Sequence, residues 1–270
     1  MKDFKKLTYS DRFIFGKVNS IDLELCRETI ELVSGISTGE GNFITVEKDI
    51  QITYRGKKTR LDLMLDTSEH RIDFDMENRK HNRSRMLPLR LRFYQDVIDL
   101  DMLTDGMKYT MLKRNVVIFL CTYDPFGKGY YRYIFKNKCA HDDKLELGDE
   151  TVKIVLNAGG RRPAPGDDVS EGLRNFLEYV KNGKVSDDFT RRLEMKVEDV
   201  VNCNDFKVEY MSAVAEYMAD EYEKDEMRKE NDVLQAKNDA LQAKNDALLE
   251  ELNAMKKRLE EYEMPENEKK

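Results

Sequence analysis

Long apolar runs are missing from this sequence of 270 residues. The longest, at 116–121, has six residues, whereas a helix that crosses a bilayer needs about 20. The N-terminal segment alternates lysine or aspartate with single apolar residues, so it lacks the apolar stretch of a secretory signal. We therefore expect a cytoplasmic protein that has no membrane partner.

Cysteine and histidine are also scarce, with four and three residues. The cysteines are widely separated, form no C-x-x-C pair and have no histidine at zinc-finger spacing. They are interpreted as reduced, mostly buried, small apolar residues. The histidines, His70, His81 and His141, are scattered, and we do not expect them to bind a metal ion.

Acidic charge is concentrated at the C-terminal end of the chain. There are 46 lysines and arginines against 53 aspartates and glutamates, which gives a net charge of −7. From Asp205 onward the chain has 11 basic and 19 acidic residues, so the part before it is nearly neutral. The low isoelectric point therefore does not exclude a local basic patch that binds nucleic acid.

The C-terminal segment repeats every seven residues, from DVLQAKN at 232–238 to NAMKKRL at 253–259. Apolar residues recur at the d positions, and the a positions have three asparagines followed by leucines. This pattern predicts a coiled coil over 205–264. Asparagine at a specifies register and favours two parallel strands, so we expect a parallel homodimer. A single solvated helix is the alternative, because the asparagines weaken the seam.

Apolar periods of two and of about 3.6 residues alternate over the rest of the chain. The candidate strands are 43–54, 58–66, 71–77, 115–122, 130–137 and 151–156. The candidate helices are 10–17, 21–34, 83–101, 168–182 and 186–202, the last two with Asp167 and Ser186 as N-cap candidates. We expect an α/β core over 1–160, a helical extension over 161–204, the coiled coil over 205–264 and a disordered tail at 265–270.

The most informative segment is RLDLMLD at 60–66, a short turn, and RIDFDME at 71–77. Strand alternation places Leu61, Leu63 and Leu65 on an apolar face and the charged residues on the other. The turn pairs residues whose numbers sum to 137, so Asp62 stands opposite Asp75.

The same register pairs Arg60 with Glu77 and Asp66 with Arg71. Asp62 and Asp75 are then left without a partner, and like charges directly opposite each other are destabilising. The pair needs a cation such as Mg²⁺, which takes one or two carboxylates together with water and phosphate oxygens. An ordinary half-exposed ribbon with solvated charges is the alternative.

A basic stretch follows at 78–95, NRKHNRSRMLPLRLRFYQ, with no acidic residue before Asp96. A basic element beside a divalent-metal site is an arrangement that binds a phosphodiester backbone. Alternatively, its arginines pair with the acidic face of the hairpin. The candidate DNA-binding residues are Arg79, Lys80, Arg83, Arg85 and Arg92.

These segments resemble the PD-(D/E)XK nuclease superfamily. They are most similar to the bacterial recombination-promoting nucleases, also described as PD-(D/E)XK family transposases. The resemblance covers roughly residues 9–160. The matching segments are Arg60-Leu61-Asp62, Asp75-Met76-Glu77, the run at 90–95, the Gly-x-x-Tyr stretch at 106–109 and VVIFLCTYDPFGKG at 116–129.

The resemblance implies a restriction-endonuclease-like mixed sheet flanked by helices and a metal-dependent DNA endonuclease that uses Mg²⁺ or Mn²⁺. It implies that Asp62 is the bridging metal ligand and Asp75 the second carboxylate, in the slot usually held by glutamate. Glu31 is a candidate outer acidic residue. The transposase description does not require DNA strand transfer.

Glu77 departs from the family pattern, which has lysine or glutamine there to orient the attacking water. Two readings follow. The chain is an active endonuclease whose dimer brings two sites onto one duplex, or a catalytically inactive DNA-binding or assembly protein. A purely structural coiled-coil scaffold, which would not bind DNA, is a third reading.

Overall fold

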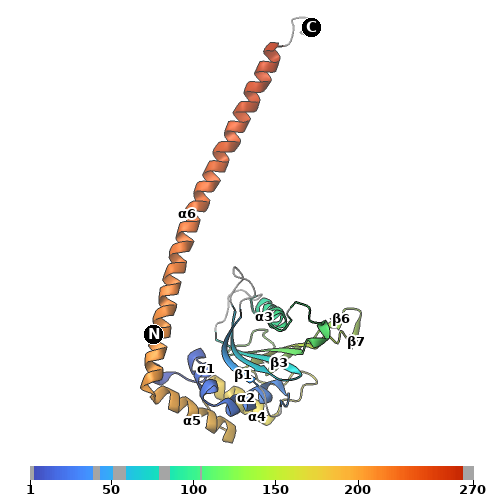
Figure 1. Cartoon of the computed structure of the whole chain (residues 1–270), viewed down its shortest axis with the longest axis vertical. Helices are drawn as coiled ribbons and strands as arrows, with labels where there is room; N and C mark the ends of the chain where they lie inside the picture. The colour runs from blue at the N-terminus through green and yellow to red at the C-terminus, as the bar shows by residue number, and fades with distance from the viewer. Residues whose placement is uncertain (1–2, 39–42, 51–58, 79–85, 104, 264–270) are drawn as a thin grey trace. The chain divides into compact units, whose positions relative to one another are not determined.

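The computed structural model describes residues 3–38, 43–50, 59–78, 86–103 and 105–263. The chain divides into two units, Met1–Lys207 and Val208–Lys270 (Figure 1). The first unit contains a mixed sheet with helices, and the second consists of a helix in its described part.

A six-stranded sheet forms the centre of the first unit, in the order β1-β2-β3-β4-β8-β5. β1, β2 and β3 pair antiparallel, β3, β4 and β8 pair parallel, and β5 adds an antiparallel edge. β4 is buried almost throughout, as expected for a parallel strand covered on both faces. The strands are β1 (Phe43–Ile50), β2 (Thr59–Asp66), β3 (His70–Glu77), β4 (Arg114–Cys121), β5 (Arg132–Phe135) and β8 (Thr151–Asn157), with β6 (Lys138–Cys139) and β7 (Asp142–Glu146) in a separate pair.

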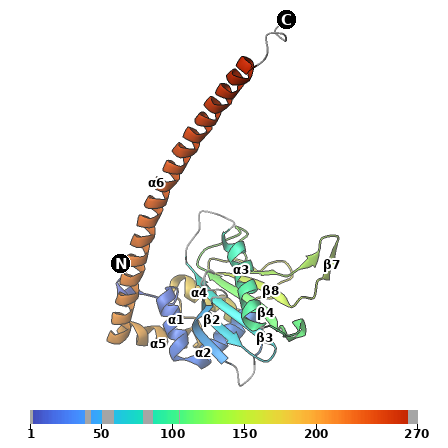
Figure 2. The same ribbon diagram turned by 45° about the horizontal axis from the view of Figure 1, so that its top comes forward.

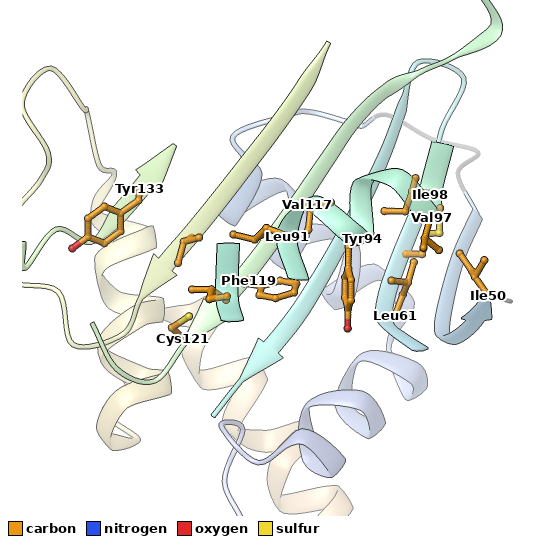
Figure 3. Close-up of a cluster of buried hydrophobic side chains, with 13 residues drawn as sticks. Ile50, Leu61, Leu91, Tyr94, Val97, Ile98, Val117, Phe119, Cys121 and Tyr133 are labelled. Atoms are coloured by element: carbon orange, nitrogen blue, oxygen red, sulfur yellow. The ribbon is translucent and has the colours of Figure 1, made fainter. Parts of the chain in front are cut away.

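Helices cover both faces of this sheet (Figure 2). α1 packs through Phe15 on Phe74 of β3, with ring centroids 5.2 Å apart. α3 packs through Tyr94 on Phe119 of β4, also at 5.2 Å, and contributes to the buried cluster in Figure 3. The helices are α1 (Arg12–Ile21), α2 (Leu23–Ser34), α3 (Met86–Met102), α4 (Glu171–Asn182) and α5 (Asp188–Asn202), with short 3₁₀ turns at Phe4–Lys6 and Tyr109–Met111. The predicted α/β class with a mixed sheet is confirmed.

The predicted N-caps of α4 and α5 are wrong. Ser170 caps α4 by accepting from Leu173 N at 3.2 Å, and Asp187 caps α5 in a capping box with Thr190. Asp167 instead accepts from Arg132 Nε at 3.3 Å. More than one cap-forming residue precedes each helix, and only the geometry of the first turn selects among them.

The predicted long C-terminal helix is confirmed as α6 (Asn204–Glu263), which has 60 residues. Leu234, Leu241 and Leu248, at the d positions, are 52–59% exposed in the single chain. The predicted disordered tail lies outside the described residues. Within the described ranges, every helix is too short or too polar to cross a bilayer.

Candidate functional site

The β2–β3 hairpin has the predicted register, with Leu63 opposite Phe74 and Met64 opposite Asp73. The predicted ion pair between Arg71 and Asp66 is present, at 2.9 Å. The predicted pair between Arg60 and Glu77 is wrong. Arg60 lies 3.1 Å from Asp49 of β1, and Glu77 pairs with Arg90 of α3. The regular pairing of β2 with β3 ends at Leu63, so residues 60 and 77 no longer face each other.

The alternation of β2 also changes near Asp62. Leu61 packs in the cluster beneath α3 together with Met64 (Figure 3), so its predicted grouping with Leu63 and Leu65 is wrong. The cause is an irregularity in the neighbouring strand, where Glu47 has a φ of 53° and residues 47 and 62 drop out of the pairing. Local irregularities of this kind re-aim side chains, here that of Asp62.

Asp62 and Asp75 bridge the two strands at the point where the regular ladder ends. Asp62 N donates to Asp75 Oδ1 at 2.7 Å, and Met76 N donates to Asp62 Oδ2 at 3.0 Å. Each carboxylate therefore accepts a hydrogen bond from the backbone of the opposite strand. Both residues are buried, with 4% and 1% of their surface exposed. The geometry fixes two acidic side chains together at one end of the hairpin.

Two arginines from helices on opposite faces of the sheet reach these carboxylates. Arg12, at the start of α1, donates from Nε to Asp62 Oδ1 at 2.9 Å. Arg90 of α3 pairs with Glu77, and one of its guanidinium nitrogens lies 3.8 Å from Asp75 Oδ2, too far for a hydrogen bond. The guanidinium of Arg90 also stacks on Phe119, 4.8 Å from the ring centroid.

Asp73 is a third buried carboxyl beside this pair, on the same face of β3 as Asp75. Among the described residues, neither oxygen of Asp73 has a hydrogen-bond donor, and neither does Oδ2 of Asp75. Burial and then the charge of Asp62 raise the pKa of Asp75 to about 8. Burial and then the charge of Asp75 raise the pKa of Asp73 well above its usual value. Asp73 and Asp75 therefore keep protons at a pH at which an exposed aspartate is ionised.

If all four buried carboxyls of Asp62, Asp73, Asp75 and Glu77 were ionised, they would bring four negative charges against the two positive charges of Arg12 and Arg90. The raised pKa values of Asp73 and Asp75 oppose that state in the metal-free protein. A bound divalent cation would favour the ionised form and release these protons, and carboxylate oxygen is the ligand that Mg²⁺ prefers. Within the described ranges, no three His, Cys, Asp or Glu side chains form a group that could hold a metal ion. Mg²⁺ is usually bound by one or two protein carboxylates together with water and substrate oxygens.

The predicted DNA-binding residues are only partly described. Arg92 lies on the exposed side of α3. Arg79, Lys80, Arg83 and Arg85 lie outside the described residues. Glu31, the predicted outer acidic residue, accepts hydrogen bonds from the amide and hydroxyl of Thr38, at 2.7 and 2.6 Å, just beyond the end of α2.

Sequence reasoning did not assign roles to Asp73 or Arg12. It placed Arg90 only in the basic stretch at 78–95, and its pair with Glu77 matches the alternative that these arginines pair with the acidic face. Asp73 had a usable signal, because it lies two residues before Asp75 and therefore on the same face of the strand. Arg90 had a weaker signal, since its i+4 neighbour Tyr94 is an aromatic residue that packs on the sheet. The sequence contains no signal for the role of Arg12, because this residue is 50 residues away from Asp62.

Comparison of the chain with protein-family models, with curated proteins and with solved structures found no match. The function of the site therefore has to follow from the geometry of its residues. That geometry is a buried carboxylate pair with a third carboxyl beside it and an arginine on either side.

Proposed function

We propose that the first unit is a Mg²⁺-dependent DNA endonuclease of the restriction-endonuclease-like type, acting in recombination or on mobile elements. Mn²⁺ suits the same oxygen ligands and would serve as an alternative cofactor. The observation that carries this proposal is the bridge between Asp62 and Asp75, in which two buried carboxylates from adjacent strands are held together and Asp75 Oδ2 has no donor in the described part of the chain.

Asp62 and Asp75 would hold the metal ion. The ion, when bound, activates water for attack on a phosphodiester and stabilises the leaving oxygen. The hydrogen bonds from the opposite strand keep both carboxylates in place, as partners outside the coordination sphere do at metal sites. The Arg12 side chain is 56% exposed and could move away from Asp62 Oδ1 to leave that oxygen for the metal ion.

Arg90 would supply the positive charge that a lysine at position 77 supplies elsewhere in the family. Its ion pair with Glu77 and its stacking on Phe119 hold the guanidinium beside Asp75. A fixed cation there would stabilise negative charge that develops on the phosphate. In this interpretation Glu77 positions Arg90, and the exposed Arg92 on the same helix adds a contact to the DNA backbone.

The second candidate function is a catalytically inactive protein that binds DNA or assembles on it. The pairing of Glu77 with Arg90 favours this alternative, because both side chains are then engaged in an ion pair. The contact of Arg12 with Asp62 favours it as well, since a guanidinium already neutralises that carboxylate.

For the second unit we propose a parallel homodimer. Its support is the row of exposed leucines at the d positions, repeated every seven residues along one continuous helix. Paired helices would bury this row. A dimer would also bring two copies of the first unit to one duplex, so that both strands can be cut.

The proposed function is tested by incubating the full chain with supercoiled plasmid and Mg²⁺, with and without chelator. Asp62→Asn and Asp75→Asn keep the shape of the site and should abolish nicking. Asp188→Asn, at a 76% exposed aspartate on α5, is the matched control and should cut normally. Full activity in both site variants would eliminate this site. DNA binding without nicking in the wild type would support the inactive alternative, and no DNA binding would support the scaffold.

A further inference from the structure

The carboxyl ends of the parallel strands β3, β4 and β8 form one edge of the sheet. Glu77, Cys121 and Asn157 are paired in a row along this edge. Adjacent strands are about 4.8 Å apart, so Asn157 lies about 10 Å from Glu77. In open α/β sheets, ligands bind just outside such carboxyl ends. The loops at 122–131 and 158–162, which follow β4 and β8, therefore begin beside the proposed site.

These two loops, called here the basic loop pair, are joined through their backbones. Tyr131 N donates to Arg162 O at 3.0 Å, and Arg161 N donates to Gly129 O at 2.9 Å. Gly160 is so close to Tyr131 that a Cβ added to it would lie 2.7 Å from the Tyr131 Cα. The basic loop pair is therefore one tightly packed surface.

Asp124 holds the first of the two loops in its turn. Its carboxylate accepts hydrogen bonds from the amides of Phe126, Gly127 and Gly129 and from the Tyr133 hydroxyl, at 2.7–3.2 Å. Burial disfavours the ionised form, but the hydrogen bonds from Tyr133 and the amides outweigh it and lower the pKa of Asp124. The hydrogen bonds of the turn thus stabilise the negative charge of Asp124.

Three cations project from the basic loop pair without an acidic partner in the described part of the chain. Lys128, Arg161 and Arg162 are all exposed. Arg162 stacks on Tyr130, with its guanidinium carbon 5.3 Å from the ring centroid. Arg132 nearby differs, since it forms an ion pair with Asp167.

Aromatic side chains connect these cations with the carboxylate site. Tyr123, Phe126 and Tyr130 pack against the buried cluster on the α3 side of the sheet. Asp75 and Glu77 contact Arg90 of α3 and so lie on the same side. Burial, then Cys121 and Glu77, raise the pKa of Tyr123, so this tyrosine lies near the Glu77 carboxylate. The aromatic residues of the basic loop pair therefore lie on the same side of the sheet as Asp75 and Glu77.

We propose that Lys128, Arg161 and Arg162 bind phosphates of the DNA backbone next to the one at the carboxylate site, because their loops begin at the sheet edge that ends in Glu77. The inference rests on the proposed function for the choice of DNA. Exposed cations that have no acidic partner among the described residues are free to hold a second phosphate of the same duplex.

The test measures how tightly the full chain binds a short fluorescein-labelled DNA duplex. Fluorescence anisotropy in the presence of chelator gives the binding constant K at salt concentrations between about 50 and 200 mM. Each lost phosphate contact lowers the slope of log K against log salt by about 0.9, so Lys128→Ala with Arg161→Ala should lower it by about 1.8. Lys128→Arg with Arg161→Lys keeps both charges and should keep the slope. Arg191→Ala with Arg192→Ala, which removes two exposed charges on α5, is the matched control.

An unchanged slope in Lys128→Ala with Arg161→Ala would overturn the inference, and so would an equal loss in the α5 control. Failure of the proposed function gives a different result. If the double alanine variant shows the expected drop in slope but the wild type does not nick plasmid in Mg²⁺, the proposed endonuclease activity is wrong and the proposed phosphate site is supported. If the wild type nicks plasmid but Lys128→Ala with Arg161→Ala has the same salt slope as the wild type, the proposed endonuclease activity is supported and the proposed phosphate site is wrong.

Discussion

Replacing Asp75 with asparagine should make the metal-free protein less sensitive to pH. The asparagine side chain would keep the acceptor for Asp62 N, and its amide would donate to the buried Asp73 carboxyl, whose oxygens have no donor within the described ranges. The pKa of Asp75 is raised to about 8 in the folded chain, chiefly by burial, from an ordinary value of 3.8. Between these two values the folded chain holds a proton that the unfolded chain has released.

The sign and size of the effect follow from this difference in bound protons. The contribution of Asp75 to stability is fully present below the ordinary pKa and is lost as the pH rises through the folded value. One proton corresponds to about 1.4 kcal/mol per pH unit. From pH 5 to pH 7 the wild type should lose about 2.7 kcal/mol more than Asp75→Asn, or roughly 5 to 11 °C of melting temperature for a unit of this size.

The measurement is thermal and urea unfolding of both proteins in chelator across this pH range, with Asp188→Asn as the control that should follow the wild type. Mg²⁺ stabilises the ionised form, so it should restore wild-type stability more at pH 8 than at pH 5 and should have little effect on Asp75→Asn. Parallel curves for the wild type and Asp75→Asn would refute the raised pKa of Asp75.

Three further predictions concern other parts of the chain. Arg90→Ala removes the ion pair that Arg90 forms with the buried Glu77 and should cost about 3 to 5 kcal/mol in urea unfolding, most of which Glu77→Gln should restore in the double variant. Gly160→Ala forces a methyl group against Tyr131 and should cost about 1 to 3 kcal/mol, without a change in charge. Leu241→Asn places a polar group in the proposed seam, so light scattering should show a dimer for the wild type and a larger monomer fraction for the variant.

Apolar periodicity predicted the fold class and the positions of most elements. The strand predicted at 115–122 is β4 at Arg114–Cys121, because a continuous apolar run suits a parallel strand covered on both faces. The strand predicted at 130–137 is shorter, Arg132–Phe135, because the preceding residues belong to the basic loop pair. The short β6–β7 pair was not predicted, since its residues are exposed and have little apolar pattern.

At the site, the sequence predicted what depends on local geometry. Asp62 and Asp75 are brought together because a short turn fixes the hairpin register. The partners of Glu77 and Arg60 were not predictable in the same way, since they come from α3 and β1. The Asp62 side chain departs from the alternation of β2 side chains between the two faces of the sheet. This departure occurs opposite Glu47, which lies in another strand. Contacts between elements distant in the sequence leave no periodic signal along a single chain.

Asp62 can be neutralised either by the guanidinium of Arg12 or by a bound metal ion. Competition between the two distinguishes a metal site from a structural cluster of carboxylates and arginines. Arg12 contacts Asp62 from the exposed side, so its removal leaves the backbone hydrogen bonds of the carboxylate pair in place. If the site is built for a divalent cation, Arg12→Ala should tighten Mg²⁺ binding, because one competing charge is lost. If the site is a structural cluster neutralised by arginines, the same change should destabilise the fold and Mg²⁺ should not compensate. Unfolding of Arg12→Ala with and without Mg²⁺ at pH 8, beside the control Arg191→Ala, tells these outcomes apart.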